Sequence, residues 1–191
     1  MDRRLFFATV TAVFLSLGLT GISLAQTHTA TQAAKASSAY LRLDGIPGDS
    51  PVMAHRGEIE IETYSWAESQ PAAGASGGRA TGRVNMGTFH FTAVLNPASP
   101  RLLQACANGQ IIRSAVLSVS VPNYEFLYWR LWDVTIRDYR SILDTRKDPR
   151  PRDEFSLEFA RIEIEYKPVT ATGAQIGPVR SGWDVRANRP F

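Results

Sequence analysis

The sequence predicts a mainly β domain with one short α-helix. Apolar and polar residues alternate with a period of two through most of the chain after Tyr40, which is typical of strands that bury one face. Residues 99–109 alone combine helical apolar spacing with start and stop signals for a helix. These patterns predict a strand-rich fold in which one helix covers part of the sheet system.

The first clear strand is predicted at residues 58–62, where two isoleucines alternate with three glutamates. Three carboxylates on one face repel each other unless they are paired, and cross-strand arginines such as Arg83, Arg161 or Arg130 are expected partners. A solvated or subunit-facing strand edge explains the glutamates without catalysis. Residues 84–91 indicate a second strand, with a change of parity near Gly87 that a bulge would produce. Residues 111–121 alternate more loosely but still favour a strand.

Residues 124–139 are unusual because they are apolar on both faces. A regular strand of this kind must be covered on both sides, inward in a sandwich or barrel and outward by a helix or a neighbouring subunit. We expect Trp132 in the core, and Trp129 either in the core or against the helix. The last two strands are expected near the C-terminus: residues 155–166, with a change of parity near Ala160, and residues 179–185.

One helix is predicted between Ser99 and Gly109. Ser99 is a favourable N-cap, Pro100 suits the first turn, and Gly109 is typical of the position that ends a helix. Its apolar face combines positions i, i+1 and i+4: Leu102, Leu103 and Cys106. Because so short a helix is marginal alone, it must pack on the sheets, with the chain's single cysteine as a small buried residue.

The first 25 residues have the features of a secretory signal peptide. Arg3 and Arg4 precede an apolar stretch over residues 5–24, and small residues stand at −3 and −1 before Gln26. An uncleaved anchor is the alternative, because the stretch approaches the ~20 residues that span a bilayer, but interspersed Gly, Thr and Ser weaken it. We expect cleavage before Gln26, a secreted or periplasmic protein, and no stable membrane insertion afterwards.

Cleavage would leave 191 − 25 = 166 residues, enough for one domain. Residues 26–39 are rich in Thr, Ala, Ser and Gln without apolar periodicity, which predicts a flexible leader before a domain over residues 40–191. Long loops are predicted at residues 46–56, 69–82 and 140–152. Such loops are uncommon in a compact β domain unless they carry function.

The charge pattern argues against nucleic acid as a partner. Lys and Arg exceed Asp and Glu by 21 − 18 = 3, and loss of Asp2, Arg3 and Arg4 would lower the net charge to +2. The arginines are scattered, and no aromatic–basic alternation marks a surface for stacking bases.

No catalytic or metal constellation emerges from the sequence. Gly74-Ala-Ser-Gly-Gly78 has the spacing of a nucleophile elbow but lacks the flanking strand and helix. His28, His55 and His90 are too dispersed to bind a metal as a pair, and His55 is expected to be a hydrogen-bonded turn or interface residue. The four tryptophans are expected in the core or an interface, not in a sugar platform. We therefore predict no enzyme, cofactor or metal.

Short motifs follow one another in a fixed order along the chain. They are Tyr40-Leu-Arg-Leu-Asp-Gly-Ile-Pro-Gly-Asp-Ser50, His55-Arg-Gly57, Tyr64-Ser-Trp66, Ala98-Ser-Pro-Arg-Leu-Leu103, Ile111-Ile112, Leu131-Trp-Asp-Val134, Glu154-Phe-Ser-Leu157, Arg161-Ile-Glu-Ile-Glu-Tyr166 and Gly182-Trp-Asp184. In this order and at these spacings they resemble the haemolysin-coregulated protein (Hcp) family, the tube subunit of type VI secretion. The resemblance covers residues 40–183.

The resemblance implies a compact two-sheet β-barrel or sandwich with one packed helix, in agreement with the strand pattern. It also implies hexameric rings that stack into a tube, with spike, sheath and effector proteins as further partners. Ring contacts in the family use strand edges and loops, so the resemblance places a candidate self-association loop at Ile46, Pro47, Gly48, Asp49, Ser50 and His55. The family has no active site, so no catalytic residue carries over.

Two functions stay open at this point. The first is a ring-forming tube subunit. The second is an exported Hcp-like β domain that acts as a periplasmic or surface binding module, because an export signal would remove the chain from the cytoplasm, where tube subunits assemble. An enzyme built on this fold is a third, weaker possibility, since no catalytic constellation supports it.

Overall fold

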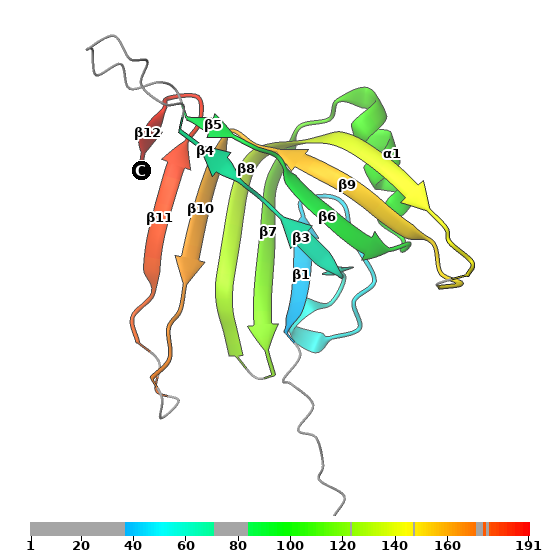
Figure 1. The fold of residues 1–191 in the computed structure, drawn as a ribbon, viewed down its shortest axis with the longest axis horizontal. Coiled ribbons are helices and arrows are strands. Elements are labelled where there is room, and N and C mark those ends of the chain that lie inside the picture. Colours follow the sequence, from blue (N-terminus) through cyan, green and yellow to red (C-terminus); the bar gives the residue numbers. More distant parts are fainter. Residues whose placement is uncertain (1–36, 71–83, 123, 147, 171–173, 175) are drawn as a thin grey trace, which may run out of the picture. The chain divides into compact units, whose positions relative to one another are not determined.

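The computed structural model describes residues 37–70, 84–122, 124–146, 148–170, 174 and 176–191 (Figure 1). The predicted signal peptide, most of the leader, and the 69–82 loop with its Gly-rich motif lie almost wholly outside this part of the chain. Within it, no helix is long and apolar enough to cross a membrane.

One α-helix, one 3-10 turn and twelve strands make up the described part of the chain, so the prediction of a mainly β fold is confirmed. In chain order they are β1 (Ser38–Leu43), η1 (Met53–His55), β2 (Ile59–Ile61), β3 (Thr63–Ser65), β4 (Glu68–Ser69), β5 (Asn85–Met86), β6 (Phe89–Val94), α1 (Ser99–Asn108), β7 (Ile112–Val121), β8 (Tyr124–Ile142), β9 (Arg152–Glu158), β10 (Arg161–Tyr166), β11 (Val179–Asp184) and β12 (Arg189–Pro190).

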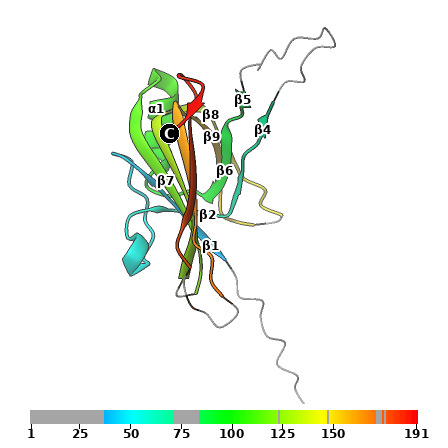
Figure 2. The ribbon, with the colours of Figure 1, turned by 90° about the vertical axis from the view of Figure 1, so that its left-hand side faces the viewer.

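Two antiparallel sheets share the long strand β8, while β4 and β5, among the described strands, pair only with each other. The large sheet has the order β12-β11-β10-β8-β7-β1-β2, and the small sheet the order β8-β9-β6-β3. At the other side β2 and β3 are consecutive, and the N–H of Glu62 between them donates to the carbonyl of Thr92 at 2.8 Å. Figure 2 shows the two layers nearly edge on, with β7 in one and β6 in the other. The predicted two-sheet sandwich is confirmed.

Strand β8 passes from one sheet to the other at a left-handed residue. Asp133 has a φ of 50°, which is uncommon for a residue other than glycine. Before it, Trp129 and Leu131 point inward, and after it Val134 and Ile136 do. The kink moves the inward parity by one residue, so apolar residues that a regular strand would place on opposite faces are buried on the same side.

The kink also decides where the tryptophans lie. Trp132, which we expected in the core, lies on the outer face and packs edge-on against Phe191, with ring centroids 5.9 Å apart. That prediction was wrong because it assumed a regular strand. Trp129 packs inside, with its ring centroid 5.3 Å from those of Trp66 and Phe89. Its predicted core position is confirmed.

Helix α1 packs against β8. It ends at Gly109, whose φ of 66° is left-handed, as predicted. Its start differs from the prediction, because Asn96 Oδ1 accepts the backbone N–H of Ala98 where Ser99 was expected to cap. The face toward the sandwich carries the buried residues Ser99, Leu102 and Ala105. Leu103 is 55% exposed, so the predicted apolar face was correct only in part.

Burial in the core predicts that alanine substitutions of two phenylalanines differ strongly in their effect on the free energy of unfolding. Phe155 is 1% exposed and stacks on Phe91 with centroids 5.3 Å apart, whereas Phe191 is 59% exposed. We expect Phe155→Ala to lower the free energy of unfolding by about 3–5 kcal/mol, since it opens a cavity. Phe191→Ala, the control, should cost about 1 kcal/mol through its lost ring contact. Urea denaturation measures both, and equal losses would contradict this assignment of the core.

Candidate self-association loop

The candidate residues lie in the connection from β1 to β2, residues 44–58, whose two arms bind each other. The N–H of Gly48 donates to the carbonyl of Gly57 at 2.8 Å, and that of Ser50 to the carbonyl of Glu58 at 3.0 Å. The N–H of Gly57 returns a bond to the carbonyl of Ser50 at 3.2 Å. Backbone bonding of this kind makes the loop an ordered projection beside β2.

Three of the candidate residues build the frame of the loop. Ile46 is buried in the core and bridges to Leu43. The buried hydroxyl of Ser50 donates to Glu60 Oε1 at 3.2 Å. A Cβ at Gly48 would lie 2.4 Å from a backbone oxygen of the opposite arm, so only glycine allows the arms to approach this closely.

The solvent side of the loop carries an apolar tip. Pro47 and Asp49 are exposed, as an interface role requires, and Val52 is also exposed. Met53 is 87% exposed at the start of η1. The sequence prediction did not include Val52 and Met53. The sequence did contain a sign of them, because they are two adjacent apolar residues in a loop without apolar periodicity.

His55 is buried and uses both ring nitrogens. Nδ1 lies 2.9 Å from Glu58 Oε2, and Nε2 lies 3.0 Å from Glu125 Oε1 at the start of β8. The ring also stacks on Tyr40 of β1, with centroids 4.0 Å apart and planes 7° from parallel. The contacts agree with the hydrogen-bonded role expected for this histidine. Glu125 could not be foreseen, because only the folded chain brings it to residue 55.

The polar contacts of Glu125 continue across the outer face of the large sheet. Its second carboxylate oxygen accepts the hydroxyl of Tyr128. Burial and this hydrogen bond raise the pKa of Tyr128 well above its usual range. Lys167 Nζ and the Arg130 guanidinium lie over the same ring, 4.3 and 5.2 Å from its centroid. Tyr128 thus connects the loop's anchor to the charges of β8 and β10.

Glu165 is the most deeply buried carboxylate of this face, at 1% exposed. Arg130 donates to Oε2 at 2.7 Å, and Arg180 of β11 approaches the same oxygen at 3.1 Å. Burial acts to raise the pKa of Glu165, but the two guanidinium groups outweigh it and hold that pKa below the ordinary value. The acidic residues of β10 are therefore part of a bonded network, and not a solvated strand face.

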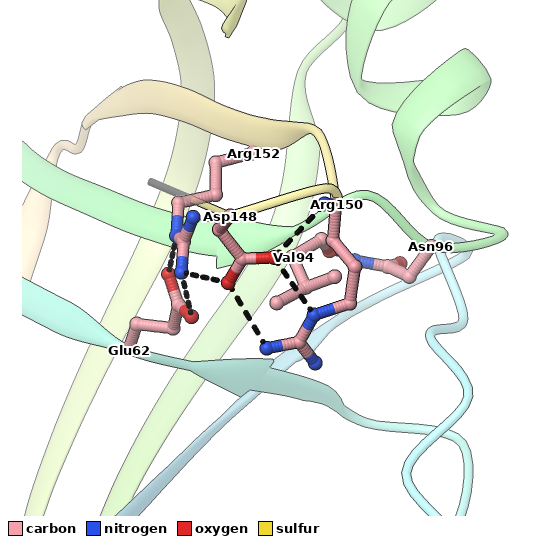
Figure 3. Close-up of polar contacts among 6 residues, drawn as sticks. All are labelled: Glu62, Val94, Asn96, Asp148, Arg150 and Arg152. Atoms are coloured by element: carbon pink, nitrogen blue, oxygen red, sulfur yellow. Dashed lines mark hydrogen bonds and ion pairs between the residues drawn. The ribbon is translucent and has the colours of Figure 1, made fainter. Parts of the chain in front are cut away.

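A second charged group ties the loop between β8 and β9 to the chain after β2 (Figure 3). Arg152 binds Glu62 with two nitrogens at 2.6 and 3.2 Å and reaches Asp148 at 2.9 Å. Asp148 also accepts from the side chain of Arg150 at 3.3 Å. Hydrogen bonds from Arg150 and Arg152 hold the pKa of Asp148 far below its usual range. Of the three glutamates predicted at residues 58–62, only Glu62 pairs with an arginine among the described residues, and that arginine is Arg152, which was not among the expected partners.

Triad-type side chains also meet on the outer face of the small sheet. Ser156 lies between His90 and Asp138 on neighbouring strands. Its buried hydroxyl donates to Asp138, while His90 Nε2 pairs with Thr88 Oγ1 at 3.0 Å. A nucleophilic serine needs the histidine as its base, so this arrangement is structural. Among the residues described, no group of three or more His, Cys, Asp or Glu could hold a metal ion.

The class of protein follows from solved structures that share this fold. One, described as a type six secretion system protein, superposes with a TM-score of 0.76 at 23% identity and covers 82% of this chain and 100% of its own. Hcp1 from Salmonella typhimurium superposes with a TM-score of 0.70 at 26% identity, covering 82% of this chain and 99% of its own. The fold is that of a type VI secretion protein.

The family model described as "Type VI secretion system effector, Hcp" matches residues 40–166. Protein hcp1 of Pseudomonas aeruginosa is 28% identical over 155 residues, which cover 78% of this chain and 95% of that protein. The chain therefore belongs to the Hcp family of type VI secretion.

The close approach at Gly48 predicts a steric effect of substitution. Gly48→Ala should lower the free energy of unfolding by about 1–3 kcal/mol, because the new methyl group meets backbone that cannot rotate away. Gly177→Ala is the matched control, since nothing lies within 4 Å of a Cβ there. Denaturant titration of both variants tests this, and a stable Gly48→Ala protein would show that the arms are not in contact.

The lowered pKa of Glu165 predicts the direction of an acid effect. A carboxylate of this kind stabilises the fold above its unfolded pKa, and the contribution is lost as pH falls through the folded pKa. Glu165→Gln should cost about 1–3 kcal/mol near neutral pH, and its difference from the wild type should shrink below about pH 4.3, the ordinary glutamate value.

Unfolding curves across this acid range measure the effect. Glu158→Gln is the control, because Glu158 makes an exposed pair with Arg137 at 3.1 Å and exposed pairs contribute about 0–1 kcal/mol. A Glu165→Gln loss that did not vary with pH would rule out the carboxylate's charge as its cause.

Proposed function

We propose that the mature chain is a structural, non-enzymatic subunit that self-assembles into hexameric rings, which stack into a tube that carries effectors. The observation that carries this proposal is the match to the Hcp family over residues 40–166. The structural match covers 99–100% of the chains of the two solved relatives. This supports the presence of the same subunit fold in this protein.

The loop over residues 44–58 fits the role of a contact between subunits. It projects from the sheet edge on a bonded frame, and its tip exposes Val52 and Met53. Methionine adapts its shape to a partner surface and is enriched in interfaces. A rigid loop with such a tip loses little conformational entropy on binding. We assign Ile46, Gly48, Ser50 and His55 to the frame, and Pro47 and Asp49 to the contact surface.

We further propose that residues 1–25 are an export signal, that 26–39 form a flexible leader, and that 40–191 are the assembling domain. The protein would then act in the periplasm or outside the cell. Spike, sheath and effector proteins of a type VI system are the further partners that a tube subunit requires.

The proposed export signal would favour a second candidate function. A chain that leaves the cytoplasm leaves the place where a sheath forms around a tube. An exported Hcp-like domain that binds a partner in the periplasm or at the surface would keep the fold without the tube. It predicts a monomer or small oligomer, whereas the first function predicts a ring.

Purified residues 26–191 distinguish the two functions. Light scattering gives the mass and negative-stain microscopy the shape. A hexameric ring supports the tube subunit, and a stable monomer at micromolar concentration supports the binding module.

The exposed tip predicts which side chain matters for assembly. Met53→Lys should weaken ring formation by about tenfold or more, since a buried apolar anchor contributes upward of 1 kcal/mol to an interface. Leu103→Lys on α1 changes another exposed apolar residue, outside the loop, and should leave ring formation unchanged. Sedimentation over a concentration series measures both, with circular dichroism as a check on folding. Rings that tolerate Met53→Lys would exclude the tip from the contact.

A further inference from the structure

His55 is held between two carboxylates, one at each ring nitrogen. A neutral imidazole has one N–H donor and one acceptor nitrogen, whereas ionised carboxylates only accept. Here Nδ1 faces Glu58 at 2.9 Å and Nε2 faces Glu125 at 3.0 Å. Both distances are those of hydrogen bonds. With both glutamates ionised, the two contacts are satisfied together only when each nitrogen carries a proton.

The surroundings support a positive ring. Tyr40 of β1 stacks on it face to face, and a cation is attracted to an aromatic face. Glu125 is held on its other oxygen by Tyr128, which orients it toward the ring. Tyr124 lines the same hollow, but its hydroxyl donates to the carbonyl of Lys167. The charged groups that face His55 are thus the two glutamates.

Because His55 lies close to the exposed tip, these contacts hold the tip in place. His55 is the last residue of η1, two positions after Met53 at the exposed tip. Glu125 belongs to β8, the strand common to both sheets. The two carboxylates therefore hold the tip-bearing turn on the sandwich from two sides, while the backbone bonds between the loop's arms lie farther from the tip.

We propose that His55 is a positioning residue of the self-association loop, and that its protonation fixes the apolar tip in the geometry that binds a second copy of this chain. The proposal rests on the proposed function for its link to ring formation. When the imidazole loses a proton, one of its nitrogens presents a lone pair to a carboxylate oxygen, and that contact becomes repulsive. The tip of the loop is then held by one carboxylate only, and assembly into hexameric rings weakens as pH rises.

The test uses the full domain, residues 26–191, at about pH 5 and about pH 8, the range in which histidine side chains change charge. Amide hydrogen exchange at Gly48, Ser50 and Gly57 reports the order of the loop. Sedimentation reports assembly, and side-chain nitrogen NMR of His55 reports whether one or both nitrogens carry protons. In the wild type we expect two protons at the lower pH, with protection and ring formation both falling at the higher pH.

Two variants and a control separate charge from simple packing. His55→Gln removes the cation and should lower protection by about 10- to 100-fold at the lower pH, the size of a lost hydrogen bond to a charged group. Glu125→Gln is the sharper test. Its amide can accept from an imidazolium or donate to a neutral ring, so protection should become independent of pH. His90→Gln changes an exposed histidine bound to Thr88 and should behave as the wild type.

The outcomes keep this proposal apart from the proposed function. If the wild type forms rings whose mass and loop protection ignore both pH and His55→Gln, the role of His55 is overturned and the tube subunit stands. If loop protection follows pH as expected but no hexameric ring forms at any pH, self-association is overturned, while the role of His55 in holding the loop stands. If Glu125→Gln lowers protection by the same factor at both pH values, so that its protection still falls with pH as in the wild type, His55 is only a packing residue.

Discussion

The sandwich depends on a single strand that must satisfy two sheets. The first half of β8 bonds to β7 and β10, and its second half bonds to β9. Backbone groups at the change of sheet still need partners, and the left-handed Asp133 allows the ladder to continue while its inward face moves by one residue. The core on both sides of the kink follows from that turn. So does the outer position of Trp132, beside the C-terminal Phe191.

Sequence patterns were reliable where they were local. Alternation located β2 at Ile59 and Ile61, and Gly109 marked the end of the only α-helix in the described chain. The kink at Asp133 escaped prediction because no residue type announces a left-handed aspartate. The partners of His55 escaped it as well, since Glu125 lies 125 − 55 = 70 positions away and meets it only through tertiary structure.

The glutamates illustrate the same limit in another way. The alternation at residues 58–62 predicted three glutamates on one face of a strand, but spacing alone carries no information about their partners or burial. Each of the three has its own partner: Glu58 contacts His55, Glu60 accepts from Ser50, and Glu62 binds Arg152. Charge on this domain is therefore arranged in specific bonds that connect loops to strands. A loop so connected is suited to present a surface without deforming.

The order of the strands also has a kinetic consequence. β1 is made first, yet it pairs with β2 and with the much later β7, where Ser38 meets Ser120. Pairings between distant segments raise the contact order, and folding then becomes slow. The large sheet therefore cannot be completed around β1 until β7, about 75 residues later, has been made.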